Sequence, residues 1–413
     1  MSSANLPTLI PRTSGIAPKK KRDIGNHTFP GSLQNTGGFY RPELDALRFG
    51  AFLCVFLTHG FPRPSSFHVG PGATRWLLAL KNAGDYGVSL FFILSSYLIM
   101  ELLCRELRRT STVHLVSFYM RRILRIWPLY FIIISLYCVV GIFRPPFRME
   151  HGRTIANLFL IGNWYIFFHP SIATPLRHLW SISVEEQFYV LWPSFFKIAR
   201  IKGIAVLSML LISLSICTIA SLTAQGGDVA VRVWLNSFVE FQFFAIGSLI
   251  SILLRGNVPR IRTKYRIVLV TVGVAMWLLS SYVFHIKQSN ISHSIQSMIT
   301  GYEVAALGST LIFVGVLGMN SKYIHSSLKY LGKISYGLYV FHETGLLIGA
   351  NMLKVAEKLQ MVPPSLWRGC DFLFTRVSAL CVTILLAALS YRFLETPFLD
   401  LKKKFTIIRS REV

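Results

Sequence analysis

Acidic residues are scarce in this sequence: 18 Asp and Glu stand against 43 Lys and Arg, which gives a formal net charge of +25. Charged residues of both signs make up 15% of the chain, hydrophobic residues make up 53%, and the mean hydropathy is +0.51. Such a composition argues against an ordinary soluble protein and predicts a polytopic membrane protein. Excess positive charge suggests nucleic-acid binding in a soluble protein. Here the basic residues cluster between long apolar runs, so we expect membrane lipids, and no nucleic acid, as their partners.

Cysteine and the common catalytic signatures are also sparse. The six cysteines are scattered and none forms a CxxC pair, which argues against a disulfide framework or a metal site. The sequence has no Walker loop, no GxGxxG followed by an acidic partner, no HExxH and no GxSxG. An ATPase and a soluble-type hydrolase therefore lack support. No N-terminal signal peptide is evident, and we expect residues 1–38, with KKKR at 19–22, to be a disordered basic cytoplasmic tail.

Long apolar runs are what the sequence does contain. A helix needs ~20 mainly apolar residues to cross a bilayer. Ten runs qualify: 44–61, 84–103, 127–144, 180–198, 203–223, 232–253, 267–285, 298–318, 334–352 and 372–394. A further run, 155–169, is short and broken by Gly162 and Asn163, so we interpret it as interfacial or re-entrant. The predicted fold is all-α, a polytopic membrane bundle of about ten transmembrane helices.

The basic residues predict the orientation of this bundle. With ten spans and the N-terminus inside, most Lys and Arg residues fall in cytoplasmic segments, as the positive-inside rule requires. Counting 155–169 as a span would place the basic segment 255–266 outside, so we favour ten spans with both termini cytoplasmic. The expected organisation is a transmembrane domain over residues 39–399, followed by a basic cytoplasmic tail over 400–413.

Two ionisable residues, which are unfavourable in a bilayer, lie in the first span. Arg48 and His59 are eleven positions apart, which places them on one helix face ~16.5 Å from each other. Ionisable groups within a span usually face the bundle interior or a wet cavity, so we expect both to line one inward surface. The alternatives are an Arg48 that reaches the lipid phosphates and a His59 that is a satisfied core residue.

A basic cluster precedes the third span. Arg121, Arg122 and Arg125 lie on its cytoplasmic side, and Arg122 and Arg125 are neighbours on a helix. Together the three could hold a phosphate or pyrophosphate through bidentate hydrogen bonds. The alternative is a basic cluster that only sets membrane orientation.

Two adjacent glutamates, Glu185 and Glu186, enter an apolar helix together. Because adjacent helical residues lie about 100° apart, the two side chains cannot face the same point. We expect one to pair with a cation such as Arg177 or His178. The other is a candidate general acid or base, or a ligand for a polar acceptor. A purely structural ion pair is the alternative.

The last two runs also contain polar groups. The run 334–352 begins with Ser335, Tyr336, Tyr339 and His342, and the spacing predicts that Ser335, Tyr339 and His342 line one face. Arg392 and Glu395 are three positions apart and are expected to pair with each other. The hydroxyls of Ser95 and Ser96 are interpreted as helix-packing groups.

The order of these motifs resembles the acyltransferase-3 family of integral membrane O-acyltransferases. The resemblance rests on YRPELDALR…H, GVSLFFILSSYL, RRILRIWPLY, HLWSISVEEQFYVLWP, ISYGLYVFH and SYRFLETPF, and runs from about Tyr40 to Phe398. It implies a bundle of about ten helices and transfer of an acyl group, usually acetyl from cytoplasmic acetyl-CoA, to a hydroxyl of a glycan, lipid-linked sugar or related acceptor. The sequence departs from the family at Ser95–Ser96, where Ser-Gly is common, and at VFHE, where tryptophan often follows the histidine. Without a C-terminal hydrolase-like domain, the chain resembles the stand-alone form.

The resemblance also assigns roles to residues. The family's Arg–ten residues–His signature falls on Arg48 and His59, its RxxR element on Arg122 and Arg125, and its paired glutamates on Glu185 and Glu186. We expect His59 to be the base, Arg48 to bind a CoA phosphate or orient the thioester, and Arg121, Arg122 and Arg125 to receive the CoA diphosphate. Either glutamate would orient His59 or bind the sugar, and Ser335, Tyr336, Tyr339 and His342 would contact the acceptor.

The expected location is the inner (plasma) membrane, as a multi-pass protein with no metal. The rival hypothesis is a membrane transporter or a lipid or glycan flippase, which ten spans and intramembrane ionisable groups would also suit. Consumption of a thioester would distinguish an acyltransferase from a transporter or a flippase. The acceptor and the length of the acyl chain are not readable from the sequence.

Overall fold

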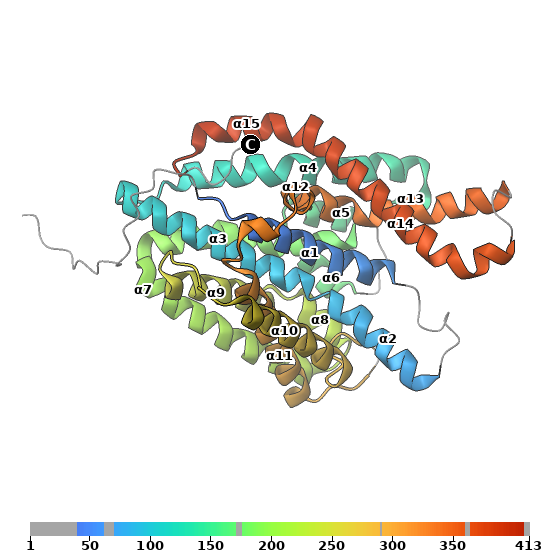
Figure 1. Cartoon of the computed structure of the whole chain (residues 1–413), viewed down its shortest axis with the longest axis horizontal. Helices are drawn as coiled ribbons and strands as arrows, with labels where there is room; N and C mark the ends of the chain where they lie inside the picture. The colour runs from blue at the N-terminus through green and yellow to red at the C-terminus, as the bar shows by residue number, and fades with distance from the viewer. Residues whose placement is uncertain (1–38, 62–69, 171–175, 290, 360–363, 409–413) are drawn as a thin grey trace, which may run out of the picture. The chain divides into compact units, whose positions relative to one another are not determined.

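The structure, a computed structural model, describes residues 39–61, 70–170, 176–289, 291–359 and 364–408 (Figure 1). Within these residues the chain is helical and contains no strand. Seven helical stretches among them are long and apolar enough to cross a membrane. The protein is therefore a polytopic helical membrane protein, as the composition predicted. The tail expected over 1–38 lies outside the described residues.

The expected apolar runs fall on helices of the structure. The helices are α1 Pro42–Gly60, α2 Pro71–Gly84, α3 Gly87–Thr110, α4 Leu115–Phe143, α5 His151–Leu158, α6 Gly162–Phe168, α7 Trp180–Gln225, α8 Val229–Leu235, α9 Ser237–Leu254, α10 Thr263–Tyr282, α11 Ile295–Val316, α12 Ser326–Lys333, α13 Ser335–Lys358, α14 Pro364–Ser390 and α15 Thr396–Lys402. α1 and α13 are not among the seven membrane-crossing stretches. In α1, three ionisable residues, Glu43, Asp45 and Arg48, interrupt the apolar surface.

The two runs expected at 180–198 and 203–223 meet within α7. The backbone of Arg200 adopts φ 57° and ψ −167°, which is not helical, and divides α7 into two helices joined by a kink. The left-handed φ is unfavourable for a residue with a side chain, and it occurs in the basic stretch between the two apolar runs. Each half of α7 is about as long as the ~20 residues that a span requires.

The segment 155–169 forms two short helices, α5 and α6, neither of which is long enough to cross a bilayer. The chain breaks at Leu160, whose φ is 58°. The fully buried Asn163 holds α6 in place by donating to the Leu235 carbonyl at 3.1 Å and to Ser237 Oγ at 2.9 Å. Gln187 Nε2 donates to the Asn163 side-chain oxygen at 2.9 Å, so the amide connects α6 to α7 and to the start of α9.

Glycine allows other helices to approach α1 closely. A Cβ on Gly87 of α3 would stand 2.4 Å from the Ala51 carbonyl oxygen, and a Cβ on Gly332 of α12 would stand 2.0 Å from the Asp45 carbonyl oxygen. Both are closer than any side-chain carbon can come, so these contacts require glycine. α1 is consequently held on two sides, and the directions in which its polar residues point are set by this packing.

The expected pair between Arg392 and Glu395 is absent from the described residues, so that prediction was wrong. Tyr391–Glu395 is π-helical. Because a π-helical turn is wider than an α-helical one, residues separated by three positions no longer lie side by side. Glu395 accepts a hydrogen bond from Ser390 Oγ at 3.3 Å instead. The Arg392 guanidinium lies over the Phe393 ring, 5.5 Å from its centroid.

Candidate active site

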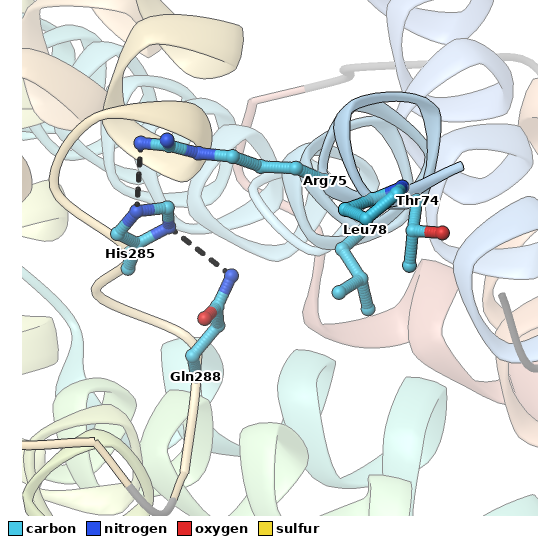
Figure 2. A pocket seen from close by; sticks show the side chains of 6 residues that line it. Thr74, Arg75, Leu78, His285 and Gln288 are labelled. Atoms are coloured by element: carbon cyan, nitrogen blue, oxygen red, sulfur yellow. Dashed lines mark hydrogen bonds between the residues drawn. The ribbon is translucent and has the colours of Figure 1, made fainter. Parts of the chain in front are cut away.

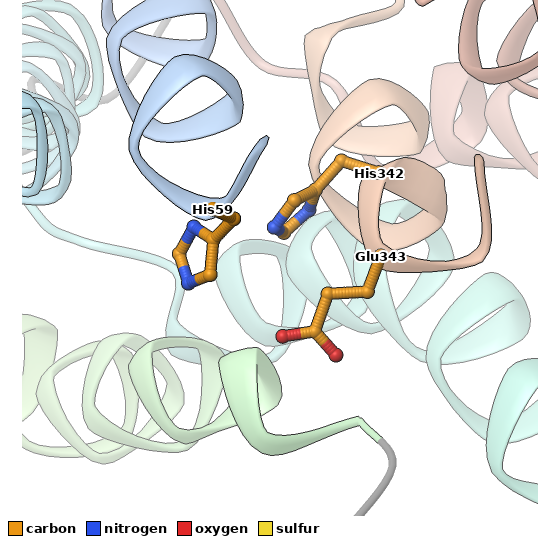
Figure 3. A group of neighbouring side chains, drawn as sticks. All are labelled: His59, His342 and Glu343. Carbon is orange, nitrogen blue, oxygen red and sulfur yellow. The ribbon is translucent and has the colours of Figure 1, made fainter. Parts of the chain in front are cut away.

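Three histidines from different parts of the chain converge at the C-terminal end of α1. His59 comes from α1, His342 from α13, and His178 from the short turn Arg177–Leu179 that precedes α7. The ring centroids of His59 and His342 are 4.9 Å apart, and those of His178 and His342 are 4.6 Å apart. Figure 3 shows His59 and His342 facing each other with Glu343 of α13 beside them. We call His59, His178, His342 and Glu343 the histidine cluster.

Backbone carbonyls fix the tautomers of two of these rings. His59 Nδ1 lies 2.9 Å from the Val55 carbonyl oxygen, and His342 Nδ1 lies 2.6 Å from the Tyr339 carbonyl oxygen. A carbonyl only accepts hydrogen bonds, so each Nδ1 carries the hydrogen and each Nε2 keeps its lone pair. His342 Nε2 is buried and has no hydrogen-bond partner among the described residues. His59 is exposed, so its Nε2 is accessible to a substrate.

The third ring is paired with a carboxylate. His178 Nε2 lies 3.1 Å from the Val340 carbonyl oxygen, and its Nδ1 lies 3.0 Å from Glu343 Oε2. The Val340 carbonyl only accepts, so Nε2 carries a hydrogen, whereas Nδ1 is buried near the carboxylate without hydrogen-bond geometry to any described residue. His178 is buried whereas Glu343 is half-buried. The contact therefore places the Glu343 carboxylate beside the His178 ring, which in turn packs against His342.

Glu185 and Glu186 lie elsewhere, and the expectation that one of them pairs with Arg177 or His178 was wrong. Glu185 accepts hydrogen bonds from Tyr189 and from Ser95 Oγ of α3, the latter at 2.5 Å. Glu186 accepts a hydrogen bond from Trp127 Nε1 of α4 at 2.9 Å. The glutamates follow His178 by about two helical turns, which is too far for an ion pair with it. The expectation that they face different points is confirmed.

The three arginines before the third span have different surroundings. Arg121 donates to Glu106 Oε2 at 3.3 Å and to the Phe405 carbonyl at 2.7 Å, so it connects α3, α4 and the C-terminal segment. Arg122 lies over the Tyr189 ring at 4.8 Å, and no carboxylate oxygen lies within 4.0 Å of its guanidinium in the described part of the chain. Arg125 is half-buried about one turn further along α4. Arg122 thus has an aromatic partner that leaves its hydrogen-bond donors available.

Arg48 lies at the other end of α1 from the histidine cluster. Its Nη1 donates to Asp45 Oδ1 at 3.0 Å, and Asp45 Oδ2 accepts from Tyr40 at 2.9 Å. Asp45 is buried, so it neutralises Arg48 within the packed first turns of α1. Arg48 and His59 lie on the same continuous helix, at its opposite ends.

Of the polar residues that begin α13, Tyr339 and His342 lie at the histidine cluster. The Tyr339 hydroxyl donates to the His178 carbonyl at 2.9 Å and lies 2.6 Å from Ser181 Oγ, so it holds the turn before α7. The Tyr336 hydroxyl donates to the Ile126 carbonyl of α4 at 2.7 Å, which removes it from the cluster. Ser335 is buried at the first position of α13.

An arginine to which the sequence assigned no role packs against α1 next to His59. The side chain of Arg376 from α14 approaches Gly60, the residue after His59: its Cδ and Nε lie 3.0 and 3.1 Å from the point where a glycine Cβ would stand. The Arg376 Nε is buried and has no hydrogen-bond partner within the described residues. The only sequence signal was an arginine inside an apolar run. The Arg376 guanidinium carbon lies 5.0 Å from the centroid of the Phe372 ring.

The cluster also has the donor set of a cation site. Ligand atoms of His59, His342 and Glu343 all lie within 4.8 Å of one another. Two histidines whose other ring nitrogens donate to carbonyls, together with one carboxylate, suit a divalent transition metal. The carboxylate of Glu343 is already opposite His178 at 3.0 Å, so binding a metal would compete with that pair.

Comparison with known proteins decides the family. Residues 41–392 match the family described as "Acyltransferase domain". The chain belongs to this acyltransferase family. Its motifs predicted this family, and no solved structure matches the chain.

Curated relatives match along most of the chain. It is 24% identical over 390 residues to "Peptidoglycan O-acetyltransferase OatA" of Listeria monocytogenes, with 87% of this chain and 56% of the relative covered. It is 27% identical over 387 residues to "O-acetyltransferase OatA" of Staphylococcus aureus, with 87% and 57% covered. A Bacillus subtilis relative, "Putative peptidoglycan O-acetyltransferase YrhL", is 27% identical over 390 residues, with 87% and 55% covered. The chain spans just over half the length of these relatives.

Proposed function

We propose that this protein transfers an acetyl group from cytoplasmic acetyl-CoA to a hydroxyl of a glycan on the outer side of the plasma membrane. The observation that carries the proposal is that His59, which is exposed, and His342, which is buried, each have an Nε2 lone pair in the same cluster. Acyl transfer to an alcohol needs a base of near-neutral strength, which histidine provides. The relatives named as peptidoglycan O-acetyltransferases support acetyl as the acyl group and peptidoglycan-type sugar as the acceptor.

The proposed topology has ten spans with both termini in the cytoplasm. α7 supplies two of these spans, on either side of its kink at Arg200. The N-terminal ends of α1 and α4, with Arg48 and Arg122, then lie on the cytoplasmic side, where the donor arrives. The histidine cluster lies at the opposite end of α1, towards the acceptor.

In the proposed reaction His59 acts as the general base. Its Nε2 takes the proton of the acceptor hydroxyl while the hydroxyl oxygen attacks the thioester carbonyl carbon. Arg376 stabilises the negative charge on the carbonyl oxygen. The carbon–sulfur bond then breaks, and the CoA thiolate leaves with the proton that His59 holds. A route through an acetyl-His59 intermediate uses the same groups in two steps.

Glu343 and His178 support this proton transfer. When His59 accepts a proton it becomes positively charged, and the nearby Glu343 carboxylate stabilises that charge. His178 keeps the carboxylate in position through its 3.0 Å contact. His342 holds the second lone pair on the same cluster and orients the acceptor hydroxyl.

The donor site is proposed along α4. Arg122 and Arg125 would hold the CoA diphosphate, with Arg122 oriented by the Tyr189 ring. Tyr189 donates in turn to Glu185, so the two glutamates line the path of the donor, away from His59. Arg121 is placed in a structural role because its Nη1 and Nη2 already donate to the Phe405 carbonyl and to Glu106.

Labelled acetyl-CoA tests the proposed function. Membranes containing the protein, with uncross-linked peptidoglycan glycan strands, should yield a labelled ester that mild base releases, and the free thiol of CoA should appear in equal amount. Membranes containing the His59→Ala variant serve as the control. A transporter or flippase would move glycan or lipid without consuming thioester, and that result would refute the proposal.

A further inference from the structure

An open pocket lies at the N-terminal end of α2, away from the histidine cluster. It has a volume of ≈ 500 Å³, within the range of ligand sites, and α2 and the loop after α10 form its walls. The residues lining it are Pro71, Thr74, Arg75, Leu78, His285 and Gln288. Figure 2 shows Arg75 reaching from α2 to His285 in that loop. Four of these six side chains are polar, which is unusual for a surface that only contacts lipid.

Arg75 is held in a defined position beside this pocket. Its Nη2 donates to the Tyr282 carbonyl at 3.2 Å and to His285 Nε2 at 3.2 Å, and its guanidinium lies 4.5 Å from the Tyr282 ring centroid. Burial, together with the neighbouring Arg75 charge, lowers the pKa of His285, so the ring is neutral and its Nε2 accepts the hydrogen bond. The remaining N–H groups of Arg75 are available as oriented donors.

An aromatic surface adjoins the pocket. The Trp76 ring stacks on the Tyr282 ring with centroids 4.1 Å apart and planes 21° apart. Trp76 nevertheless remains 53% exposed. One face of the indole is therefore covered by tyrosine and the other is open. An open indole face next to fixed polar groups suits a sugar, whose C–H face packs on the ring while its hydroxyls take the hydrogen bonds.

The loop that carries His285 and Gln288 is anchored to the bundle. Lys287, between them, places its Nζ 3.3 Å from Asp85 Oδ2 and 2.9 Å from the centroid of the Trp234 ring. Burial lowers the pKa of Lys287 to about 8, and the Asp85 carboxylate opposes that effect. Because these contacts hold the loop against the turn between α2 and α3 and against α8, the pocket is formed before any ligand binds.

The pocket also has a defined relation to the catalytic helix. Thr58, the residue before His59, donates to the Lys81 carbonyl at the C-terminal end of α2, at 2.7 Å. Arg75 precedes Lys81 by six residues, or about 9 Å along the helix axis. One sugar ring cannot reach both His59 and Trp76, so an acceptor that uses both sites must contain several linked sugars.

We infer that Trp76, Arg75 and the pocket between α2 and the loop after α10 bind a sugar of an extended glycan acceptor whose modified sugar lies at His59. This inference rests on the proposed function and adds that the enzyme selects polymeric over short acceptors. Membrane-interface aromatics are the competing explanation for an exposed tryptophan near the ends of helices.

The experiment compares two acceptors and four chains. Purified protein reconstituted in lipid vesicles receives labelled acetyl-CoA and either a peptidoglycan disaccharide or an uncross-linked octasaccharide. The chains are wild type, Trp76→Ala, Trp76→Phe and Leu80→Ala. Leu80 lies one turn from Trp76 on α2, is 56% exposed and is outside the pocket, so its variant controls for lost lipid contact. Isothermal titration of the octasaccharide without acetyl-CoA measures binding independently of catalysis.

We expect Trp76→Ala to raise the KM and Kd for the octasaccharide about five- to tenfold, which is the loss of one stacking contact. The kcat, and the KM for the disaccharide, should stay at the wild-type value, Trp76→Phe should recover most of the affinity, and Leu80→Ala should match wild type. Unchanged octasaccharide binding in Trp76→Ala, or an equal effect of Leu80→Ala, would overturn the inference and indicate a lipid-facing tryptophan. Tight octasaccharide binding in a protein that acetylates neither acceptor would refute the proposed function and keep the glycan site.

Discussion

Replacing Glu343 by glutamine removes one negative charge from the histidine cluster and keeps the shape of the side chain. Ligand atoms of Glu343, His59 and His342 lie within 4.8 Å of one another. At that separation and an effective dielectric constant of about 20, a carboxylate attracts a protonated imidazole by about 3 kcal/mol. The Glu343 side chain is 28% exposed, so solvent screens part of this attraction, and we expect about 1–2 kcal/mol to be lost from the transition state.

This loss corresponds to a fall in kcat of about 5- to 30-fold for Glu343→Gln. The KM for acetyl-CoA should not change, because the donor site that we propose along α4 is separate from the cluster. The assay is initial-rate transfer from labelled acetyl-CoA at equal amounts of folded protein. Glu150→Gln is the matched control: Glu150 is an exposed carboxylate that accepts from Tyr165, outside the cluster, so this variant should keep the wild-type kcat. A wild-type kcat in Glu343→Gln would refute the assignment of the carboxylate to charge stabilisation.

Three further substitutions separate donor binding, charge stabilisation and structure. Arg122→Ala should raise the KM for acetyl-CoA about tenfold or more, since a charge-assisted contact to phosphate is worth about 1.5–3 kcal/mol, and an unchanged KM would place the donor elsewhere. Arg376→Gln should lower kcat about 100-fold if the guanidinium stabilises the carbonyl oxygen, with both KM values near wild type; a change confined to KM would assign it to binding. Tyr336→Phe removes a hydrogen bond to the Ile126 carbonyl, so unfolding followed by tryptophan fluorescence should show about 1 kcal/mol less stability while acceptor KM stays constant. A raised KM for the acceptor would instead indicate that Tyr336 contacts the acceptor, as the sequence predicted.

The helices could be predicted from sequence because membrane spans have a local signature. Each apolar run of sufficient length falls on a helix, including the two runs that α7 joins at Arg200 and the short segment that breaks at Leu160. The length and hydropathy of a span depend only on the residues of that span, so both can be read from a single sequence. The helices α1 and α13 fall outside the apolar criterion because they carry polar groups, and these are the helices that build the site.

The site itself could be predicted only in part. The spacing of Tyr339 and His342 predicted a shared face, and both lie at the histidine cluster. Arg48 shares a helix with His59 but lies at its other end, paired with Asp45, so its expected role stays a prediction. The contact between His178 and Glu343 joins segments that are far apart in the chain, so helical periodicity cannot predict it. The rule that residues three positions apart contact each other also failed in the segment Tyr391–Glu395, where the backbone is not α-helical.

That failure was the expected pair of Arg392 and Glu395. Their spacing predicts contact on an α-helix, but the segment is π-helical and separates them. Tyr336 shows a second limit of local patterns. It shares its helix with Tyr339 and His342, yet it faces α4, because the neighbouring helices decide which face meets the site.

The central claim is that the Nε2 of His59 removes the proton of the acceptor hydroxyl. The most direct test is the rate of transfer of labelled acetyl groups from acetyl-CoA to glycan by His59→Ala, in membranes that contain it at the wild-type level. The account predicts a rate about 10²- to 10⁴-fold below wild type, the usual contribution of a positioned general base, with acetyl-CoA binding unchanged. Transfer at the wild-type rate by folded, membrane-inserted His59→Ala would contradict it.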